Sequence, residues 1–505
     1  MPPKLKIFRS GKLLRETDAV IGETLLERIG VVGVFLDSPC GGKGKCGKCL
    51  IQLEPDGERM LACRTYVDGD MDVYLPDELD MKIAGSTGSA AVQGTSGRYG
   101  VAVDIGTTTV VAHLTNLDTC ERIATSSGVN AQRTYGADVI SRIQYCADKG
   151  HETLTKLIRE QLASLIRETC DVSGVRAEDI EYVSIAANTI MEHLAAGYSP
   201  VGMGVVPFTT VSLFGEELAA GGDLPVAGDA RIYYAPAISA YVGGDITAGM
   251  LAAKLEDTEG PVIYLDIGTN GEIALKLGNT YYCCATAAGP AFEGAEITMG
   301  MAAVSGAINH VKWEGGLKTT VIGDSIPKGL CGSGLLDTLA VLLETGAVDE
   351  TGRMLDADEI EHSIAKHIGE IEGKNVFYLS LDDKSVYMTA SDIRKLQLAK
   401  SAIAAGIQTL LLNCGISEEQ VKLFVLAGGF GSYMDQYSAA RVGLFPKAFL
   451  PVSQTLGNMA GEGAAIALCS SHARDVLNDI RKRCEYIELS SSIVFNEQFV
   501  EQMMF

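Results

Sequence analysis

A short motif that occurs twice constrains the fold more than any other feature of this sequence. Val103-Asp104-Ile105-Gly106-Thr107 recurs as Leu265-Asp266-Ile267-Gly268-Thr269. Each copy lies between two strand-like runs, which are 99–103 and 109–116 for the first copy and 261–265 and 272–277 for the second. Two copies of a strand, a glycine turn and a second strand predict a duplicated domain.

Helical periodicity alternates with these strands. Apolar residues recur at helical spacing in four segments, 152–168, 246–254, 335–345 and 393–412. Strands that alternate with helices predict an α/β body. Near the N-terminus, strand-like runs at 5–8 and 12–14 and a short helical run at 24–29 predict a small β-rich domain that precedes this body.

The length and a glycine-rich segment predict the domain boundaries. A chain of 505 residues is too long for one ordinary core. The fourteen residues GSTGSAAVQGTSGR at 85–98 have the composition of a flexible connector, with an expected span of about 20 Å. We therefore expect a small domain at 1–84, a linker at 85–98, two halves of the body at 99–257 and 258–456, and a C-terminal helix and strand within 457–505 that return to the body.

Four cysteines near the N-terminus have the spacing of metal ligands. Cys40, Cys46, Cys49 and Cys63 form the pattern C-x5-C-x2-C-x13-C, which resembles the plant-type ferredoxin loop that holds a [2Fe-2S] cluster. Glycines between them permit sharp turns that point backbone N–H groups at sulfur. A structural zinc site and a set of free cysteines are the alternatives, but a zinc ribbon normally has two C-x2-C pairs and this segment has one.

The repeated turns are suited to binding phosphate. Each presents backbone N–H and hydroxyl donors, and each follows an aspartate that can hold hydrated Mg2+. The donors are Gly106, Thr107, Thr108, Thr109, Gly268, Thr269, Asn270 and Gly271, and the aspartates are Asp104 and Asp266. A strand at 423–426 leads into a turn where Gly428 and Gly429 would let an adenosine approach the backbone. One such turn alone would be an ordinary hairpin, but the three elements together favour a nucleotide site that is not a P-loop, because no G-x-x-x-x-G-K-[ST] is present.

The charge balance excludes other classes of ligand. The chain has 41 Lys and Arg against 64 Asp and Glu, a net charge of −23, which disfavours binding to nucleic acid or to an anionic membrane. It has neither an uninterrupted apolar stretch of roughly 18 residues nor the apolar core of a signal peptide. We therefore expect a cytoplasmic protein with no nucleic-acid or membrane partner.

Together, the nucleotide elements resemble the two phosphate motifs and the adenosine motif of the actin, sugar-kinase and heat-shock-chaperone ATPase superfamily. Further segments are similar to those of the reductive activators of corrinoid proteins, namely 187–193, 236–245, 289–295, 332–334, 392–400 and 485–489. That family joins a plant-type ferredoxin-like domain to a duplicated actin-like (ribonuclease H-like) ATPase domain, and the resemblance covers essentially the whole chain. Within these segments, Gly332 and Ser333 are expected to bind nucleotide. Asp245 is expected to orient the attacking water or to bind Mg2+ through water, or alternatively to be a helix N-cap.

The resemblance implies an ATP-hydrolysing iron-sulfur activase. Its cofactors would be a [2Fe-2S] cluster, ATP and Mg2+, and its partner a corrinoid protein of a methyltransferase system, whose cobalt it would return from Co(II) to Co(I). A reduced ferredoxin, a flavoprotein or a similar carrier would supply the electron, and a homodimer is allowed. Two other functions fit parts of the pattern: a small-molecule kinase of the same superfamily, and a chaperone-like ATPase whose cluster senses redox state.

Overall fold

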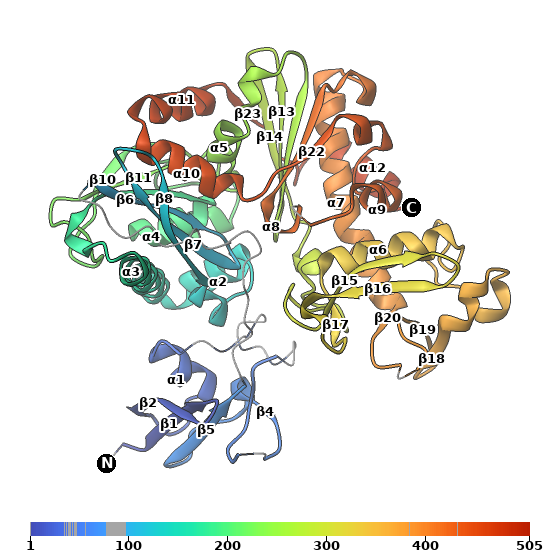
Figure 1. Cartoon of the computed structure of the whole chain (residues 1–505), viewed down its shortest axis with the longest axis horizontal. Helices are drawn as coiled ribbons and strands as arrows, with labels where there is room; N and C mark the ends of the chain where they lie inside the picture. Colours follow the sequence, from blue (N-terminus) through green and yellow to red (C-terminus); the bar gives the residue numbers. More distant parts are fainter. Residues whose placement is uncertain are drawn as a thin grey trace.

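The structure is a computed structural model, and it describes residues 2–34, 36, 38, 42, 44, 48–55, 57–76, 97–382, 384–431 and 433–505. Of the predicted linker, Gly97 and Arg98 lie within this range and the other twelve residues lie outside it. Figure 1 shows a small N-terminal unit, two large sheets with their helices, and a lobe that carries two small sheets.

The N-terminal unit is built around a three-stranded sheet with the order β2-β1-β5. Strand β1 is antiparallel to β2 and parallel to β5. The alternation of β1 buries Leu5 and Ile7 against Leu25 and Ile29 of α1, and Thr24 begins that helix with a capping box. The elements are β1 (Lys4–Arg9), β2 (Lys12–Asp18), α1 (Leu25–Val31), β3 (Leu50–Ile51), β4 (Met60–Leu61) and β5 (Met71–Leu75).

The first large sheet has β6 near its centre and the order β10-β11-β9-β6-β7-β8. Strand β6 pairs antiparallel with β7 and parallel with β9. Its strands are β6 (Tyr99–Ile105), β7 (Thr109–Asn116), β8 (Arg122–Val129), β9 (Ile180–Ala187), β10 (Glu217–Ala219) and β11 (Arg231–Tyr234). Apolar residues of α2 (Val139–Lys149), α3 (Glu152–Ser173) and α4 (Thr189–Ala196) pack with these strands in one core.

The second large sheet has the order β22-β21-β12-β13-β14-β23, and its first five strands repeat the arrangement of β11-β9-β6-β7-β8. Strand β12 is antiparallel to β13 and parallel to β21, as β6 is to β7 and β9. Its strands are β12 (Val262–Ile267), β13 (Gly271–Leu277), β14 (Thr280–Thr286), β21 (Leu423–Ala427), β22 (Ser453–Thr455) and β23 (Cys484–Tyr486). The 25-residue helix α7 (Ala390–Cys414) packs in the core of this sheet.

Two helices lie between the large sheets, α5 (Gly244–Ala252) and α10 (Met459–Cys469) (Figure 1). Ile246 and Met250 of α5 pack with the second sheet, whereas Ala248 packs with the first sheet and with α10. A Cβ on Gly463 of α10 would lie 2.1 Å from the carbonyl oxygen of Ala248, so the crossing of the two helices requires a glycine there. The C-terminal segment thus returns to the region between the sheets.

The lobe follows the second copy of the motif. It contains β15 (Ala307–Trp313), β16 (Leu317–Val321), β17 (Gly329–Leu330), α6 (Gly332–Glu344), β18 (Ile368–Ile371), β19 (Lys374–Tyr378) and β20 (Tyr387–Thr389). The remaining helices are α8 (Gly428–Gly431), α9 (Gln436–Val442), α11 (Ser471–Lys482) and α12 (Ile493–Glu501). In the part of the chain that the structure describes, no helix has both the length and the apolarity needed to cross a bilayer.

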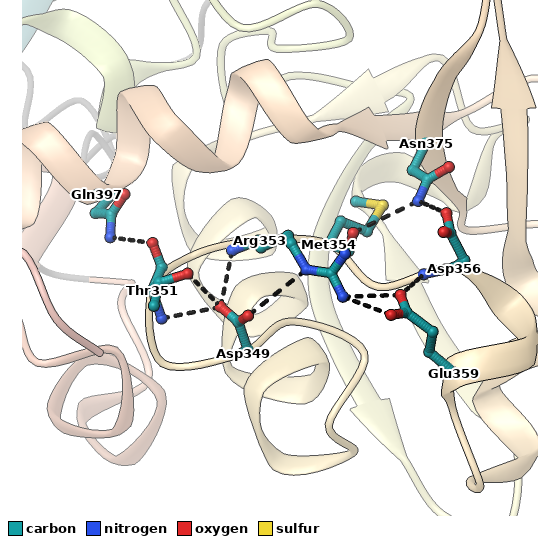
Figure 2. Close-up of polar contacts among 8 residues, drawn as sticks. All are labelled: Asp349, Thr351, Arg353, Met354, Asp356, Glu359, Asn375 and Gln397. Atoms are coloured by element: carbon teal, nitrogen blue, oxygen red, sulfur yellow. Dashed lines mark hydrogen bonds and ion pairs between the residues drawn. The ribbon is translucent and has the colours of Figure 1, made fainter.

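A polar network fixes the segment that joins α6 to β18 (Figure 2). Asp349 accepts hydrogen bonds from the backbone N–H groups of Thr351 and Arg353, and Arg353 donates to Glu359 at 2.7 Å. Gln397 of α7 donates to the carbonyl oxygen of Thr351 at 3.0 Å. Asn375 of β19 donates to Asp356 at 2.6 Å, so the network connects this segment both to the small sheet and to α7.

Candidate functional site

The first repeated turn connects β6 to β7 as a tight hairpin. Gly106 N donates to the carbonyl oxygen of Thr109 at 2.8 Å. A Cβ on Gly106 would lie 2.9 Å from that same oxygen, so a larger residue would force the turn open. Thr107 is buried, whereas Thr108 and Thr109 are partly exposed. The hairpin therefore presents hydroxyl donors on the rim of the first sheet.

Three residues that sequence reasoning missed hold this hairpin in place. Arg142 of α2 is fully buried, and its Nη2 donates to the carbonyl oxygen of Thr107 at 2.5 Å. Asn130 Nδ2 donates to the carbonyl oxygen of Gly106 at 2.8 Å, and Asn188 Nδ2 to Thr107 Oγ1 at 3.2 Å. Burial lowers the pKa of Arg142 to about 9, which leaves it cationic at neutral pH. A buried cation behind the turn favours an anion in front of it.

The second turn connects β12 to β13 in the same way. Gly268 N donates to the carbonyl oxygen of Asn270 at 2.9 Å. Gly271 begins β13, and a Cβ there would lie 2.8 Å from Thr286 Oγ1, which donates to the carbonyl oxygen of Gly271 at 3.0 Å. Thr269 is buried. Both predicted hairpins therefore exist, and each follows the central strand of its sheet.

The predicted aspartates lie close enough to influence one another. Asp104 accepts from Asn458 Nδ2 at 2.6 Å, and Asp266 accepts from Tyr264 Oη at 3.2 Å. Burial raises the pKa of Asp104 to about 7 and that of Asp266 to about 6. Burial, followed by the charges of Asp266 and Asp104, raises the pKa of Asp245 to about 8. The three carboxyl groups thus form one electrostatically coupled set between the two sheets.

The sequence motifs assign no functional role to two further acidic residues in this region, Glu272 and Glu192. Burial and the neighbouring Asp245 and Asp266 raise the pKa of Glu272 well above its ordinary value. Burial and Asp245 do the same for Glu192, which is fully buried in α4. Asp245 itself lies in the first turn of α5, whose N-cap is Gly243, so the alternative of Asp245 as an N-cap is wrong. The region concentrates acidic groups that a cation or protons would stabilise.

A glutamate connects the two hairpins. Thr108 Oγ1 of the first hairpin donates to Glu293 Oε2 at 2.9 Å, and Thr269 Oγ1 of the second donates to Glu293 Oε1 at 2.9 Å. Glu293 ends a short 3-10 turn, Pro290–Glu293, within a segment that resembles the corrinoid activators. The contact joins residues 185 positions apart, which no local pattern could predict.

The glycine turn after β21 lies directly against the second hairpin. Gly428 has φ +88°, and a Cβ there would lie 2.5 Å from Asp266 Oδ1 and 2.6 Å from the carbonyl oxygen of Ile267. Gly429 has open space where a Cβ would be. Residues 428–431 form a single helical turn, α8. The predicted adenosine element is therefore adjacent to one of the two hairpins that were predicted to bind phosphate.

Gly332 and Ser333 begin helix α6 beside this turn. A Cβ on Gly332 would lie 2.0 Å from the carbonyl oxygen of Phe292 and 2.4 Å from the ring of Phe430. The two phenylalanine rings stack with centroids 5.4 Å apart. Ser333 Oγ donates to the carbonyl oxygen of Asn309 at 2.8 Å, so its hydroxyl hydrogen is engaged by β15. Gly332 therefore packs against Phe292 and Phe430, beside the predicted nucleotide elements.

Two of the four predicted cluster ligands lie in the described part of the chain. Cys49 and Cys63 are buried, and their Sγ atoms are 3.3 Å apart. This separation is slightly less than the roughly 3.8 Å between two sulfur ligands of one tetrahedral ion with metal–sulfur bonds of about 2.3 Å, so a small side-chain adjustment would let both thiols bind the same ion. Gly42 and Gly44 have φ of +82° and +68°, the left-handed conformations that a glycine-rich loop provides. Cys40 and Cys46 lie outside the described residues.

Comparison with known proteins identifies matches along most of this chain. The family described as the C-terminal domain of RACo, the ASKHA domain, matches residues 260–505, and the one described as the RACo middle region matches residues 99–258. The corrinoid activation enzyme RamQ of Eubacterium limosum is 30% identical, over 98% of each chain. A [Co(II) methylated amine-specific corrinoid protein] reductase of Methanosarcina barkeri is 23% identical, over 81% of this chain and 77% of that protein.

A solved structure agrees with these matches. It is that of a reductive activator for corrinoid,iron-sulfur protein, with a TM-score of 0.73 and 28% identity, and the alignment covers 100% of this chain and 98% of that one. The fold is thus an α/β multidomain fold that contains an actin-like ASKHA domain. The resemblance drawn from the sequence motifs is confirmed. This chain belongs to the RACo family, the reductive activators of corrinoid proteins.

Proposed function

We propose that this chain reduces the cobalt of a corrinoid protein from Co(II) to Co(I), with an electron that passes through an N-terminal [2Fe-2S] cluster under the control of Mg-ATP. The observation that carries the proposal is the placement of two glycine-threonine hairpins and three coupled aspartates between two sheets in which five strands have the same order. The names of the relatives support the reaction, because one is a corrinoid activation enzyme and another a Co(II) corrinoid protein reductase.

The matching sheets support a duplicated actin-like ATPase. Each has a central strand with a hairpin partner on one side and a parallel partner on the other. In this proposal the hairpin donors hold the phosphates of ATP, and Gly428 and Gly429 accommodate the adenosine. The chain has a net charge of −23, so these local donors and the buried Arg142 must provide the attraction for an anion.

The carboxyl groups are suited to a hydrated magnesium ion. Mg2+ usually keeps several waters and binds through one or two carboxylates together with substrate phosphates. In this proposal Asp104 and Asp266 bind the ion, and Asp245 orients water beside them. Their raised pKa values show why a cation would help, since ionising the three groups together in a buried site is costly. When bound, Mg2+ would neutralise charge that develops on the phosphates.

The N-terminal unit is suited to a cluster with four cysteine ligands. Cys49 and Cys63 are near enough to serve as two of them, and we propose Cys40 and Cys46 as the other two. When bound, the cluster supplies a one-electron carrier. A reduced ferredoxin or flavoprotein would provide the electron.

Nucleotide matters because the cobalt reduction is uphill for ordinary donors. Each 59 mV of deficit in a one-electron step costs about 1.4 kcal/mol, a factor of ten in the equilibrium. The chain can offset this only by binding the partner differently in its two nucleotide states. Helices α5 and α10 pack between the sheets. In this proposal a change at the aspartates is transmitted through these two helices and alters the orientation of one sheet relative to the other.

The test combines the purified protein with a Co(II) corrinoid protein, a flavoprotein or chemical reductant, and Mg-ATP. We expect the absorption spectrum of Co(I), and no Co(I) when ATP is omitted. Full reduction without nucleotide, or a phosphorylated small molecule as the product of ATP turnover, would contradict the proposal. Iron and acid-labile sulfide, each expected at two per chain for a [2Fe-2S] cluster, are measured on the same sample.

A further inference from the structure

The contacts of Glu293 give this residue a place in the nucleotide site that the motifs do not assign. Its carboxylate accepts one hydrogen bond from Thr108 and one from Thr269, each at 2.9 Å. These hydroxyls belong to the two hairpins that are proposed to hold phosphate, so one anionic side chain uses a donor from each. Hydrogen bonds to a carboxylate are stronger than those between neutral groups.

The same donors cannot serve Glu293 and a terminal phosphate at once. A phosphate between the hairpins would need the hydroxyls of Thr108 and Thr269, and its charge would repel the carboxylate. The Glu293 side chain, alone or together with the 3-10 turn that carries it, would therefore have to move when a triphosphate binds.

The backbone on the N-terminal side of Glu293 permits such a movement. Gly289 and Gly294 flank the 3-10 turn with φ of +74° and +78°. A Cβ on Gly294 would lie 2.7 Å from the backbone nitrogen of Met301, so the second glycine is required by a close approach of the backbone. Gly289 has open space around it and can change its backbone conformation, whereas Gly294 is held by this packing.

A movement of the turn would reach the other nucleotide elements. Phe292, next to Glu293, is 1% exposed and stacks on Phe430 of the glycine turn. The carbonyl oxygen of Phe292 also packs against Gly332 at the start of α6. The turn 290–293 therefore touches both hairpins, the glycine turn and α6.

We propose that Glu293 is an autoinhibitory latch that joins the two hairpins through Thr108 and Thr269, imitates the terminal phosphate of ATP, and is displaced when the triphosphate binds. The proposal rests on the assignment of the hairpins as the phosphate site. It makes Glu293 a determinant of affinity for the terminal phosphate, distinct from a residue that activates water.

The test measures the equilibrium dissociation constants of Mg-ATP and of AMP for the whole protein and for Glu293→Ala and Glu293→Gln. Latching raises the apparent dissociation constant in inverse proportion to the fraction of protein that remains competent to bind. We expect Glu293→Ala to bind Mg-ATP about tenfold more tightly, a gain of about 1.4 kcal/mol. Glu293→Gln should bind with an intermediate constant, because the amide keeps a contact without the charge. AMP affinity should not change in either variant, since AMP lacks the terminal phosphate.

Glu296→Gln is the matched control, because it removes the same charge from an exposed position three residues away, and it should bind both nucleotides as the unsubstituted protein does. Unchanged Mg-ATP affinity in both Glu293 variants with a loss of kcat would overturn the latch and make Glu293 a residue of the chemical step. Weaker Mg-ATP binding in Glu293→Gln with an unchanged melting temperature would also overturn it. A parent protein that binds no Mg-ATP would instead refute the nucleotide site itself.

Discussion

Replacing Asp245 by Asn should change how the stability of the metal-free protein depends on pH. Burial and the charges of Asp266 and Asp104 raise the pKa of Asp245 from 3.8 to about 8. A carboxyl group whose pKa is raised on folding binds more protons in the native state. Its contribution is therefore fully present below the unfolded pKa and is lost as pH rises from about 4 through about 8. Asn cannot ionise, so the variant lacks this contribution.

The magnitude follows from the same pKa. Each pKa unit corresponds to about 1.4 kcal/mol. From pH 5.5 to the pKa of about 8, Asp245 is protonated in the native protein and ionised in the unfolded protein. This interval spans roughly 2.5 pH units, so the loss of stability by pH 9 is about 3 kcal/mol. As the pH rises from 5.5 to 9, the free energy of unfolding should therefore decrease in both proteins. We expect the decrease to be about 3 kcal/mol smaller in Asp245→Asn than in the unsubstituted protein.

The assay is urea unfolding at both pH values in EDTA, with the free energy extrapolated to zero urea. Asp229→Asn is the control, because Asp229 is exposed and should leave the pH dependence of the parent unchanged. If Asp245→Asn loses as much stability between pH 5.5 and pH 9 as the parent does, Asp245 is not a buried, electrostatically coupled acid. The account of the carboxyl site would then be refuted.

The other predictions concern the two proposed cofactor sites. Asp104→Ala and Asp266→Ala should each lower ATP turnover by orders of magnitude while the visible spectrum of the cluster is unchanged, because a metal-organised phosphate site loses its main electrostatic contribution. Turnover at the parent rate in both variants would show that the hairpins are structural. Cys49→Ser should lose or distort the cluster, measured as iron and sulfide content, and ATP hydrolysis should persist. An intact [2Fe-2S] spectrum in Cys49→Ser would exclude Cys49 as a ligand.

Local patterns in the sequence predicted the elements that carry the site. The run 109–116 is strand β7, and the helical periodicity of 393–412 lies within α7. Both repeated turns are hairpins at the ends of central strands, because glycine and the alternation of apolar residues determine such turns locally. Helix α3 extends to Ser173, beyond the predicted end at 168, since tertiary contacts of its last turn continue the helix.

The contacts between distant segments could not be predicted from local patterns. Asn458 reaches Asp104 across 354 residues, and Glu293 reaches Thr108 across 185. Arg142 occupies the buried face of an otherwise ordinary amphipathic helix, so nothing in its neighbours distinguishes it from a surface arginine. Burial sets the pKa values of Glu192 and Glu272, and burial depends on the packing of both sheets. Such roles become visible only when the two halves of the chain are placed together.

The central claim is that one electron passes from the N-terminal cluster to cobalt only when Mg-ATP is bound. The most direct measurement uses protein whose cluster has been reduced and freed of excess reductant. This protein is mixed with a Co(II) corrinoid protein, and the cluster and cobalt are followed together by electron paramagnetic resonance and absorption. With Mg-ATP, we predict that the reduced-cluster signal disappears as Co(II) is lost, one electron per cobalt. Without it, both signals should persist. Loss of Co(II) while the cluster stays reduced, or equal transfer in the absence of Mg-ATP, would contradict the account.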